Sequence, residues 1–266
     1  MQTDELDPVA HTSRLTAAMR AAESRRPDAL FADPFAEQLA GASARQLAEE
    51  FDGGPTIPVR TRYFDDAFAE LRPSQIALLA AGMDTRAFRL DFTPGTTLFE
   101  LDRPEVLAYK ERVIDAQARC ARRTVGVDLA ADWRDPLREA GFRADLPTCW
   151  LVEGLTQYLE ESAVLTLLDR LTDLSAPGST LLLDVVGRSV LEAHAMRATL
   201  DWMAEHGAPW LFGTEEPEAL LTARGWDPEV SLFSTVGTRL GRWPYPDAPR
   251  GTPGVPHGYL IRAALR

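Results

Sequence analysis

Two residues near the middle of the chain have the types and spacing of a nucleoside-binding site. Gly82 follows an apolar run at 75–81, and Asp102 closes a second apolar run about 20 residues later. A glycine after a buried strand lets the backbone approach a ligand closely, and an acid ending the next strand can accept hydrogen bonds from ribose hydroxyls. Glu100, two positions earlier on the same strand face, is the competing acid, and we prefer Asp102.

These residues depend for their positions on an alternation of strands and helices. Apolar runs predict strands at 75–80, 97–101, 123–127, 147–152 and 179–186. The intervening segments predict helices at 84–90, 104–118, 133–140 and 160–174. This alternation is typical of an α/β fold with a mostly parallel sheet that helices cover on both faces.

The two ends of the chain depart from this alternation. Helices predicted from Thr12 or Ser13 to Glu23, from Pro34 to Ala40 and from Val59 to Leu71 suggest an N-terminal helical cap at 1–73. The remainder, 74–266, would be the core, with an insert at about 188–214. A long helix at 188–206 and another at 215–224 lead to two last strands near 227–235 and 257–265. Because no helix is expected between these strands, they predict an antiparallel hairpin at the edge of a seven-stranded sheet.

Composition excludes several classes of function. The net charge of −12 argues against a nucleic-acid binder, which needs a basic face. No apolar stretch approaches the ~18 residues of a membrane span, and the acidic N-terminus does not resemble a secretory signal. Cys120 and Cys149 show no metal-ligand spacing, so we expect no metal, and reduced thiols in a cytoplasmic protein. A small-molecule substrate is the expected partner, and the oligomeric state stays open.

Ordered sequence blocks identify a family. They are ESRRPDALF at 23–31, RTRYFDD at 60–66, AGMDTR at 81–86, ELDRPEV at 100–106, VDL at 127–129, and EGL at 153–155 with YL at 158–159. With these blocks the chain resembles the leucine carboxyl methyltransferase family, and more closely its bacterial branch of polyketide-type O-methyltransferases. The resemblance runs from about 13 to 187 and is weaker beyond. It implies a Rossmann-like class I methyltransferase fold and S-adenosylmethionine as cofactor.

The resemblance also implies roles for residues after the first three strands. The backbone of Gly82, with the preceding Ala81, would face the methionine part of the cofactor, and Asp102 would take the ribose hydroxyls. Asp128 and Leu129 would meet the adenine through a side chain and a backbone amide, although Asp128 could instead cap a helix. The chain departs from the family at Ala80, where relatives often have glycine, and the added methyl group narrows this turn.

Two arginines and a glutamate complete the implied cofactor site. In the family an arginine of the RTRYFDD block pairs with the methionyl carboxylate of the cofactor. Arg60 and Arg62 diverge by roughly 200° on a helix, so one should face the site and the other solvent, and we prefer Arg60. Glu153 ends the fourth strand, where class I enzymes place a residue beside the sulfonium, although a capping role is the alternative.

The family name favours a carboxylate as the methyl acceptor, on a small natural product of polyketide type. An ionised carboxylate needs no general base, and none of the four histidines lies in a recognisable catalytic motif. The tryptophans and methionines of the insert would line an apolar acceptor pocket, or, as the alternative, pack a helix against the sheet. The alternatives are a phenol or alcohol acceptor, a nicotinamide-dependent oxidoreductase, and a non-catalytic binding protein. Against the oxidoreductase, no Gly-x-Gly-x-x-Gly motif follows the first predicted strand.

Overall fold

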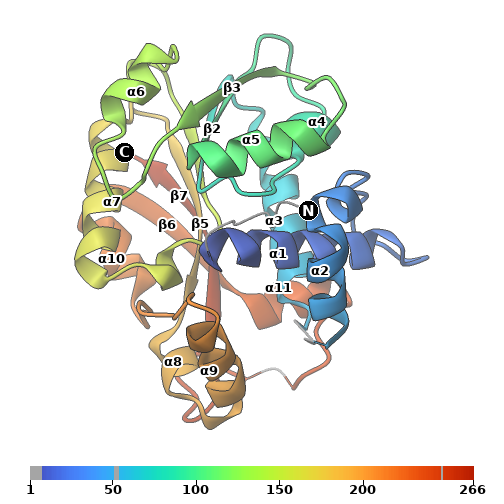
Figure 1. Cartoon of the computed structure of the whole chain (residues 1–266). Helices are drawn as coiled ribbons and strands as arrows, with labels where there is room; N and C mark the ends of the chain where they lie inside the picture. The colour runs from blue at the N-terminus through green and yellow to red at the C-terminus, as the bar shows by residue number, and fades with distance from the viewer. Residues whose placement is uncertain (1–7, 51–53, 247) are drawn as a thin grey trace.

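One seven-stranded sheet forms the centre of the molecule. A computed structural model describes residues 8–50, 54–246 and 248–266 (Figure 1). The strands are β1 (Gln75–Leu79), β2 (Thr97–Asp102), β3 (Ala121–Gly126), β4 (Cys149–Val152), β5 (Thr180–Val186), β6 (Trp226–Leu232) and β7 (Gly258–Leu265). Their order is β3-β2-β1-β4-β5-β7-β6; β7 is antiparallel to both neighbours, and the other pairs are parallel. The predicted α/β fold is confirmed, and the first five strands end within about two residues of their predicted bounds.

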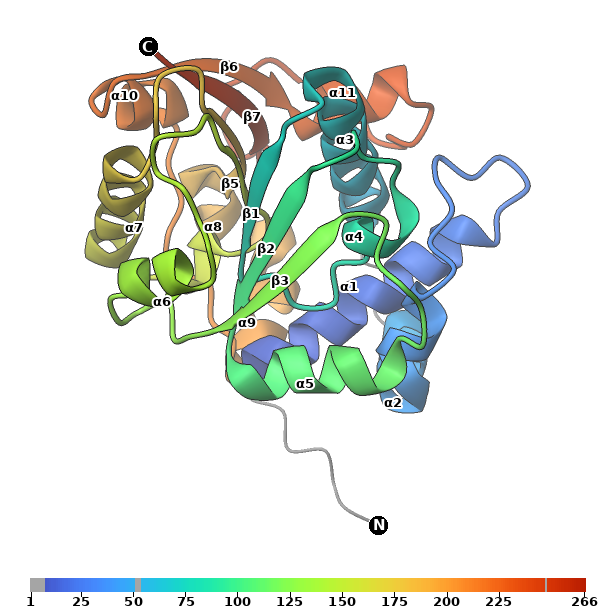
Figure 2. The same ribbon diagram turned by 90° about the horizontal axis from the view of Figure 1, so that it is seen from above.

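Helices cover the sheet in two layers (Figure 2). On one side lie α1 (Pro8–Ser24), α2 (Ala36–Glu50), α3 (Thr56–Leu71), α4 (Arg86–Arg89), α5 (Pro104–Val113) and α11 (Phe233–Arg239). On the other lie α6 (Arg134–Glu139), α7 (Glu161–Asp173) and α10 (Pro217–Thr222). Successive strand residues alternate between the layers: Ile76 and Leu78 join the first core, and Ala77 and Leu79 the second. The central strands are therefore apolar throughout, as the sequence indicated.

The predicted long helix at 188–206 is wrong. The segment contains α8 (Arg188–Glu192), a 3₁₀ turn η2 (His194–Met196) and α9 (Arg197–Glu205). The break lies at Ala193, whose backbone is extended (φ −67°, ψ 131°) and whose side chain is buried. Alanine favours helix, so the extended conformation of this residue runs against its intrinsic propensity. Likewise α5 ends at Val113 rather than 118, because Ile114 takes an extended conformation.

The C-terminal strands pair as predicted, but their connection is not a simple hairpin. Helix α11 lies between them, where the sequence was expected to continue the strand to 235. Its buried residues Phe233 and Val236 are three apart, so they share one helix face, and α11 packs against α3. Gly237 permits close approach, since a side chain there would meet the ring of Trp243.

The N-terminal helices pack into the same core as the sheet, with Leu39 and Val59 fully buried. The second helix is longer than predicted: it reaches Glu50, past a kink at Gly41 (φ 68°). The division into a cap at 1–73 and a core at 74–266 stays a prediction. Among the described residues, no helix is long and apolar enough to cross a membrane.

Candidate active site

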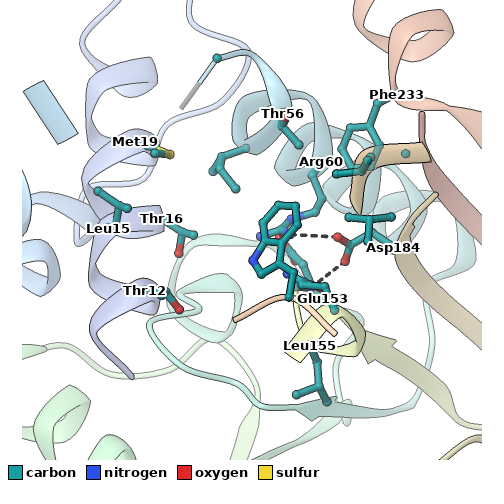
Figure 3. Close-up of a pocket in the computed structure, with 18 of the residues that line it drawn as sticks. Thr12, Leu15, Thr16, Met19, Thr56, Arg60, Glu153, Leu155, Asp184 and Phe233 are labelled. Carbon is teal, nitrogen blue, oxygen red and sulfur yellow. Dashed lines mark hydrogen bonds and ion pairs between the residues drawn. The ribbon is translucent and has the colours of Figure 1, made fainter. Parts of the chain in front are cut away.

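A cavity of about 850 Å³ opens where the parallel strands end. Its wall includes the C-terminal ends of β1, β2, β4 and β5, the turns after β1 and β4, and the start of β7. Helices α1 and α3 close one side, and Leu15 and Met19 of α1 face Arg60 across the space (Figure 3). The insert contributes Met196, Met203 and Trp210. The volume lies in the range of small-molecule sites, and most of the wall is apolar.

The turn after β1 brings two predicted site residues into contact. Gly82 has a left-handed backbone (φ 45°), and its N–H donates to Asp102 Oδ2 over 2.7 Å. Ala81 also lines the cavity, and its N–H donates to the carbonyl of Leu101 over 3.1 Å. Ala80 has a φ of 51°, a conformation that costs an L-residue about 1–2 kcal/mol. The methyl group by which the chain departs from the family pattern therefore lies at a strained position.

The two candidate acids of β2 lie in different surroundings. Glu100 is fully buried beside Lys110 (2.7 Å) and Arg122 (2.8 Å), and it does not line the cavity. Asp102 lines the cavity, and its Oδ1 accepts the N–H of Arg103 over 2.7 Å. Burial raises the pKa of Asp102, and the hydrogen bonds from the backbone N–H groups of Gly82 and Arg103 partly oppose this rise. Of the two acids, Asp102 therefore has the position from which it could meet a ligand.

The two arginines of α3 diverge as the helix geometry predicts. Arg60 is buried on the cavity wall, where it pairs with Glu153 and Asp184, each at 2.9 Å (Figure 3). Burial alone would lower the pKa of Arg60, but these two carboxylates raise it. Arg62 does not line the cavity; it pairs with Asp66 and donates to the carbonyl of Leu30.

Glu153 belongs to a buried ionic network. It accepts from Arg60 and also from Arg86 (2.7 Å), whose guanidinium pairs in turn with Asp65 (2.7 Å). Burial would raise the pKa of Glu153, but the two guanidinium groups hold it below its usual value. Asp184 receives the N–H of Gly154 over 2.6 Å, which fixes the turn after β4. This network gives the wall beside Glu153 a fixed geometry and an ionised carboxylate.

Asp128 and Leu129 lie apart from the other predicted residues. Neither lines the cavity. Asp128 is exposed, and its Oδ1 accepts the N–H of Ala130 within a turn rather than capping α6. Leu129 is half-buried against the second core. Their implied contact with adenine stays a prediction.

Several cavity residues were not singled out from the sequence as cofactor-binding residues. Helix α1 contributes Thr12, Ser13, Thr16 and Arg20, and Arg20 donates to the carbonyl of Met83 and pairs with Asp33 at 2.9 Å. His257 also lies on the wall, 5% exposed, and no motif around it indicated this.

The comparisons with known proteins identify the family. The sequence profile described as leucine carboxyl methyltransferase matches residues 13–172. A protein of Parafrankia sp. (strain EAN1pec), provisionally named an S-adenosyl-L-methionine-dependent methyltransferase, is 40% identical over 255 residues, covering 88% of this chain and 82% of its own. The chain belongs to the leucine carboxyl methyltransferase family. The family resemblance seen in the sequence is therefore confirmed.

Further members and solved structures agree. A similarly named Streptomyces coelicolor protein is 37% identical, covering 94% of this chain and 93% of its own. The crystal structure of a provisionally named methyltransferase from Thermobifida fusca superposes with a TM-score of 0.64 at 17% identity, covering 96% and 94% of the two chains. The crystal structure of a Streptomyces avermitilis protein superposes with a TM-score of 0.61 at 14% sequence identity, covering 94% of this chain and 97% of its own. At these identities the likeness shows the fold, and it confirms the class I methyltransferase architecture.

The cavity of this leucine carboxyl methyltransferase family member fits a nucleoside cofactor. Its Gly82 turn presents backbone where a ligand can approach, and Asp102 has lone pairs beyond those used by its two amide donors. Gly154 (φ 65°) keeps the opposite turn open, since a side chain there would meet the Arg60 guanidinium. Ala81, Gly82, Asp102, Arg60 and Glu153 therefore surround one space, whereas Arg62, Asp128 and Leu129 do not line it.

Proposed function

We propose that this chain transfers a methyl group from S-adenosylmethionine to an oxygen atom of a small, largely apolar acceptor. The single observation that carries the proposal is the cavity that joins the Gly82 turn and Asp102 to Glu153. Family membership and the names of the relatives support the cofactor. The apolar side chains of Met203 and Trp210 support an apolar acceptor, and a polyketide-type natural product is such a compound.

In this proposal the residues of the chain bind and align the reactants. The Gly82 backbone would face the methionine part of the cofactor, and Asp102 would accept from its ribose hydroxyls. The cofactor supplies an electrophilic methyl group on a sulfonium. Glu153, held ionised by Arg60 and Arg86, provides negative charge on that wall of the cavity. Transfer is then a displacement in which alignment of donor and acceptor supplies most of the acceleration.

Two kinds of acceptor oxygen are candidates. The family's name favours a carboxylate, which would need a positive partner on the cavity wall, and Arg60 and Arg62 are the arginines to consider. In the structure Arg62 does not line the cavity, and Arg60 already pairs with two carboxylates. That observation favours the second candidate, a phenol or alcohol hydroxyl.

Calorimetry and product analysis test the proposal. S-adenosylmethionine and S-adenosylhomocysteine should bind at micromolar levels, and NAD should not; this pattern would also exclude the nicotinamide-dependent alternative. Methyl transfer to any acceptor, followed by mass spectrometry, would exclude a non-catalytic binding protein. Mild alkali then separates the two acceptors, because methyl esters hydrolyse and aryl ethers do not. Absence of binding by either sulfur compound would refute the assignment.

A further inference from the structure

Four polar side chains of the cavity wall have a buried atom without a hydrogen-bond partner among the described residues. They are Gln157 (Oε1), Trp210 (Nε1), Ser234 (Oγ) and His257 (Nε2). Buried polar atoms are nearly always paired, because an unmade hydrogen bond costs about 1–3 kcal/mol. None of the four belongs to the Gly82 turn or to the end of β2, where the cofactor would be held. All four belong to residues that line the cavity, and a bound ligand with polar groups would complete their hydrogen bonding.

His257 is held firmly in this part of the wall. It directly precedes β7, whose first residue, Gly258, pairs with Val186 at the end of β5. The N–H of His257 donates to Ser189 Oγ over 3.1 Å, and its carbonyl accepts from the N–H of Gly187 over 2.8 Å. The imidazole therefore projects from a backbone that is fixed on both sides, and only 5% of the residue is exposed.

The charges on the cavity wall favour a neutral acceptor. Among the described residues, each of the three arginines that line the cavity already faces a carboxylate: Arg20 faces Asp33 at 2.9 Å, Arg60 faces Asp184 at 2.9 Å, and Arg103 faces Glu105 at 3.7 Å. The wall also carries carboxylates of its own, among them Asp102 and Glu153. An acceptor carboxylate would add a further negative charge, which would lose hydration beside the carboxylates of the wall. A neutral hydroxyl would not carry the cost of burying a charge there.

We propose that His257 is the general base for methylation of a phenolic or alcoholic hydroxyl; this inference rests on the proposed function. The acceptor hydroxyl gives its proton to His257 Nε2, and its oxygen forms the new bond to the methyl carbon. The electron pair of the broken carbon–sulfur bond stays on sulfur, which becomes a neutral thioether. The proton on the imidazole passes to water when the products leave. Gln157, Trp210 and Ser234 would orient the acceptor through their unpaired atoms.

The experiment compares two probes of the same shape, 2-naphthol and 2-naphthoic acid, each incubated with the full chain and S-adenosylmethionine. We expect methylation of 2-naphthol and not of 2-naphthoic acid. His257→Gln keeps a hydrogen-bonding group near Nε2 but cannot accept the proton, so it should lower the rate at least ~100-fold. His194→Gln is the matched control, because His194 is exposed and does not line the cavity, and it should retain the wild-type rate.

Two further measurements make each result decisive. Calorimetry with S-adenosylhomocysteine should give wild-type affinity for His257→Gln, so that a lost rate reflects the acceptor step. Failure of the wild-type chain to bind this compound would refute the proposed function itself. Equal methylation of 2-naphthoic acid by wild type and His257→Gln would overturn only the inference about His257.

If neither probe is methylated, histidine ¹⁵N resonances decide. The His257 signal is identified by its loss in the variant. A shift of this signal when 2-naphthol is added to the complex with S-adenosylhomocysteine would support the inference, and an unchanged signal would overturn it.

Discussion

Ala80→Gly should stabilise the protein, although glycine usually weakens a fold. Ala80 has a φ of 51°, which costs an L-residue about 1–2 kcal/mol. Glycine removes that strain, but it also raises the conformational entropy of the unfolded chain, which lowers the stability by about 0.4–1 kcal/mol. The difference is a net gain of about 0–1.6 kcal/mol with a mid-value of about 0.8 kcal/mol, and this mid-value corresponds to about 2–3 °C in the melting temperature of a chain of this size.

Thermal unfolding followed by circular dichroism measures this effect, and the neighbouring alanine provides the control. Ala81 is not among the residues with positive φ, so Ala81→Gly gains nothing from relief of strain and should destabilise. The affinity for S-adenosylhomocysteine should be at least maintained in Ala80→Gly, since the change only removes a methyl group from the cavity wall. A melting temperature that falls equally in both variants would show that the turn is not strained at Ala80.

Further predictions concern the charged residues. Asp102→Ala should weaken S-adenosylhomocysteine binding by roughly 2–3 kcal/mol in calorimetry, whereas Glu100→Ala should lower the melting temperature and change affinity less. A larger loss of affinity in Glu100→Ala than in Asp102→Ala would show that Glu100, and not Asp102, is the acid that binds the ligand. Arg60→Met leaves the carboxylates of Glu153 and Asp184 without this partner and should cost about 3–5 kcal/mol in urea unfolding, so a near-neutral result would contradict the network. The guanidinium groups hold the pKa of Glu153 below its ordinary 4.5 against the effect of burial, so its ionised form adds stability above pH 4.5 that is lost as the pH falls through the lowered pKa. Glu153→Gln should therefore flatten the acid limb of the melting-temperature profile, and an unchanged acid limb would show that Glu153 does not contribute to it.

Local patterns were sufficient for the strands and insufficient for the parts that depend on distant contacts. Continuous apolar runs located β1 and β2, and the Gly82–Asp102 contact follows from their parallel pairing. The pairing of Arg60 with Asp184 joins residues 124 positions apart, and no spacing rule connects them. His257 reaches the cavity only because β7 lies between β5 and β6, so its neighbours were not visible in the sequence around it.

The insertion of β7 between β5 and β6 also sets the order in which the sheet can be completed during synthesis. Chains emerge from the ribosome N-terminus first, so β6 has no neighbour to pair with until β7, the last strand of the sequence, is available. Until then the edge of β5 stays open, and open strand edges promote association between chains. We therefore expect translation arrested before β7 to release aggregation-prone chains that also lack His257, so a nascent chain would acquire a complete sheet and a complete cavity wall in the same late step.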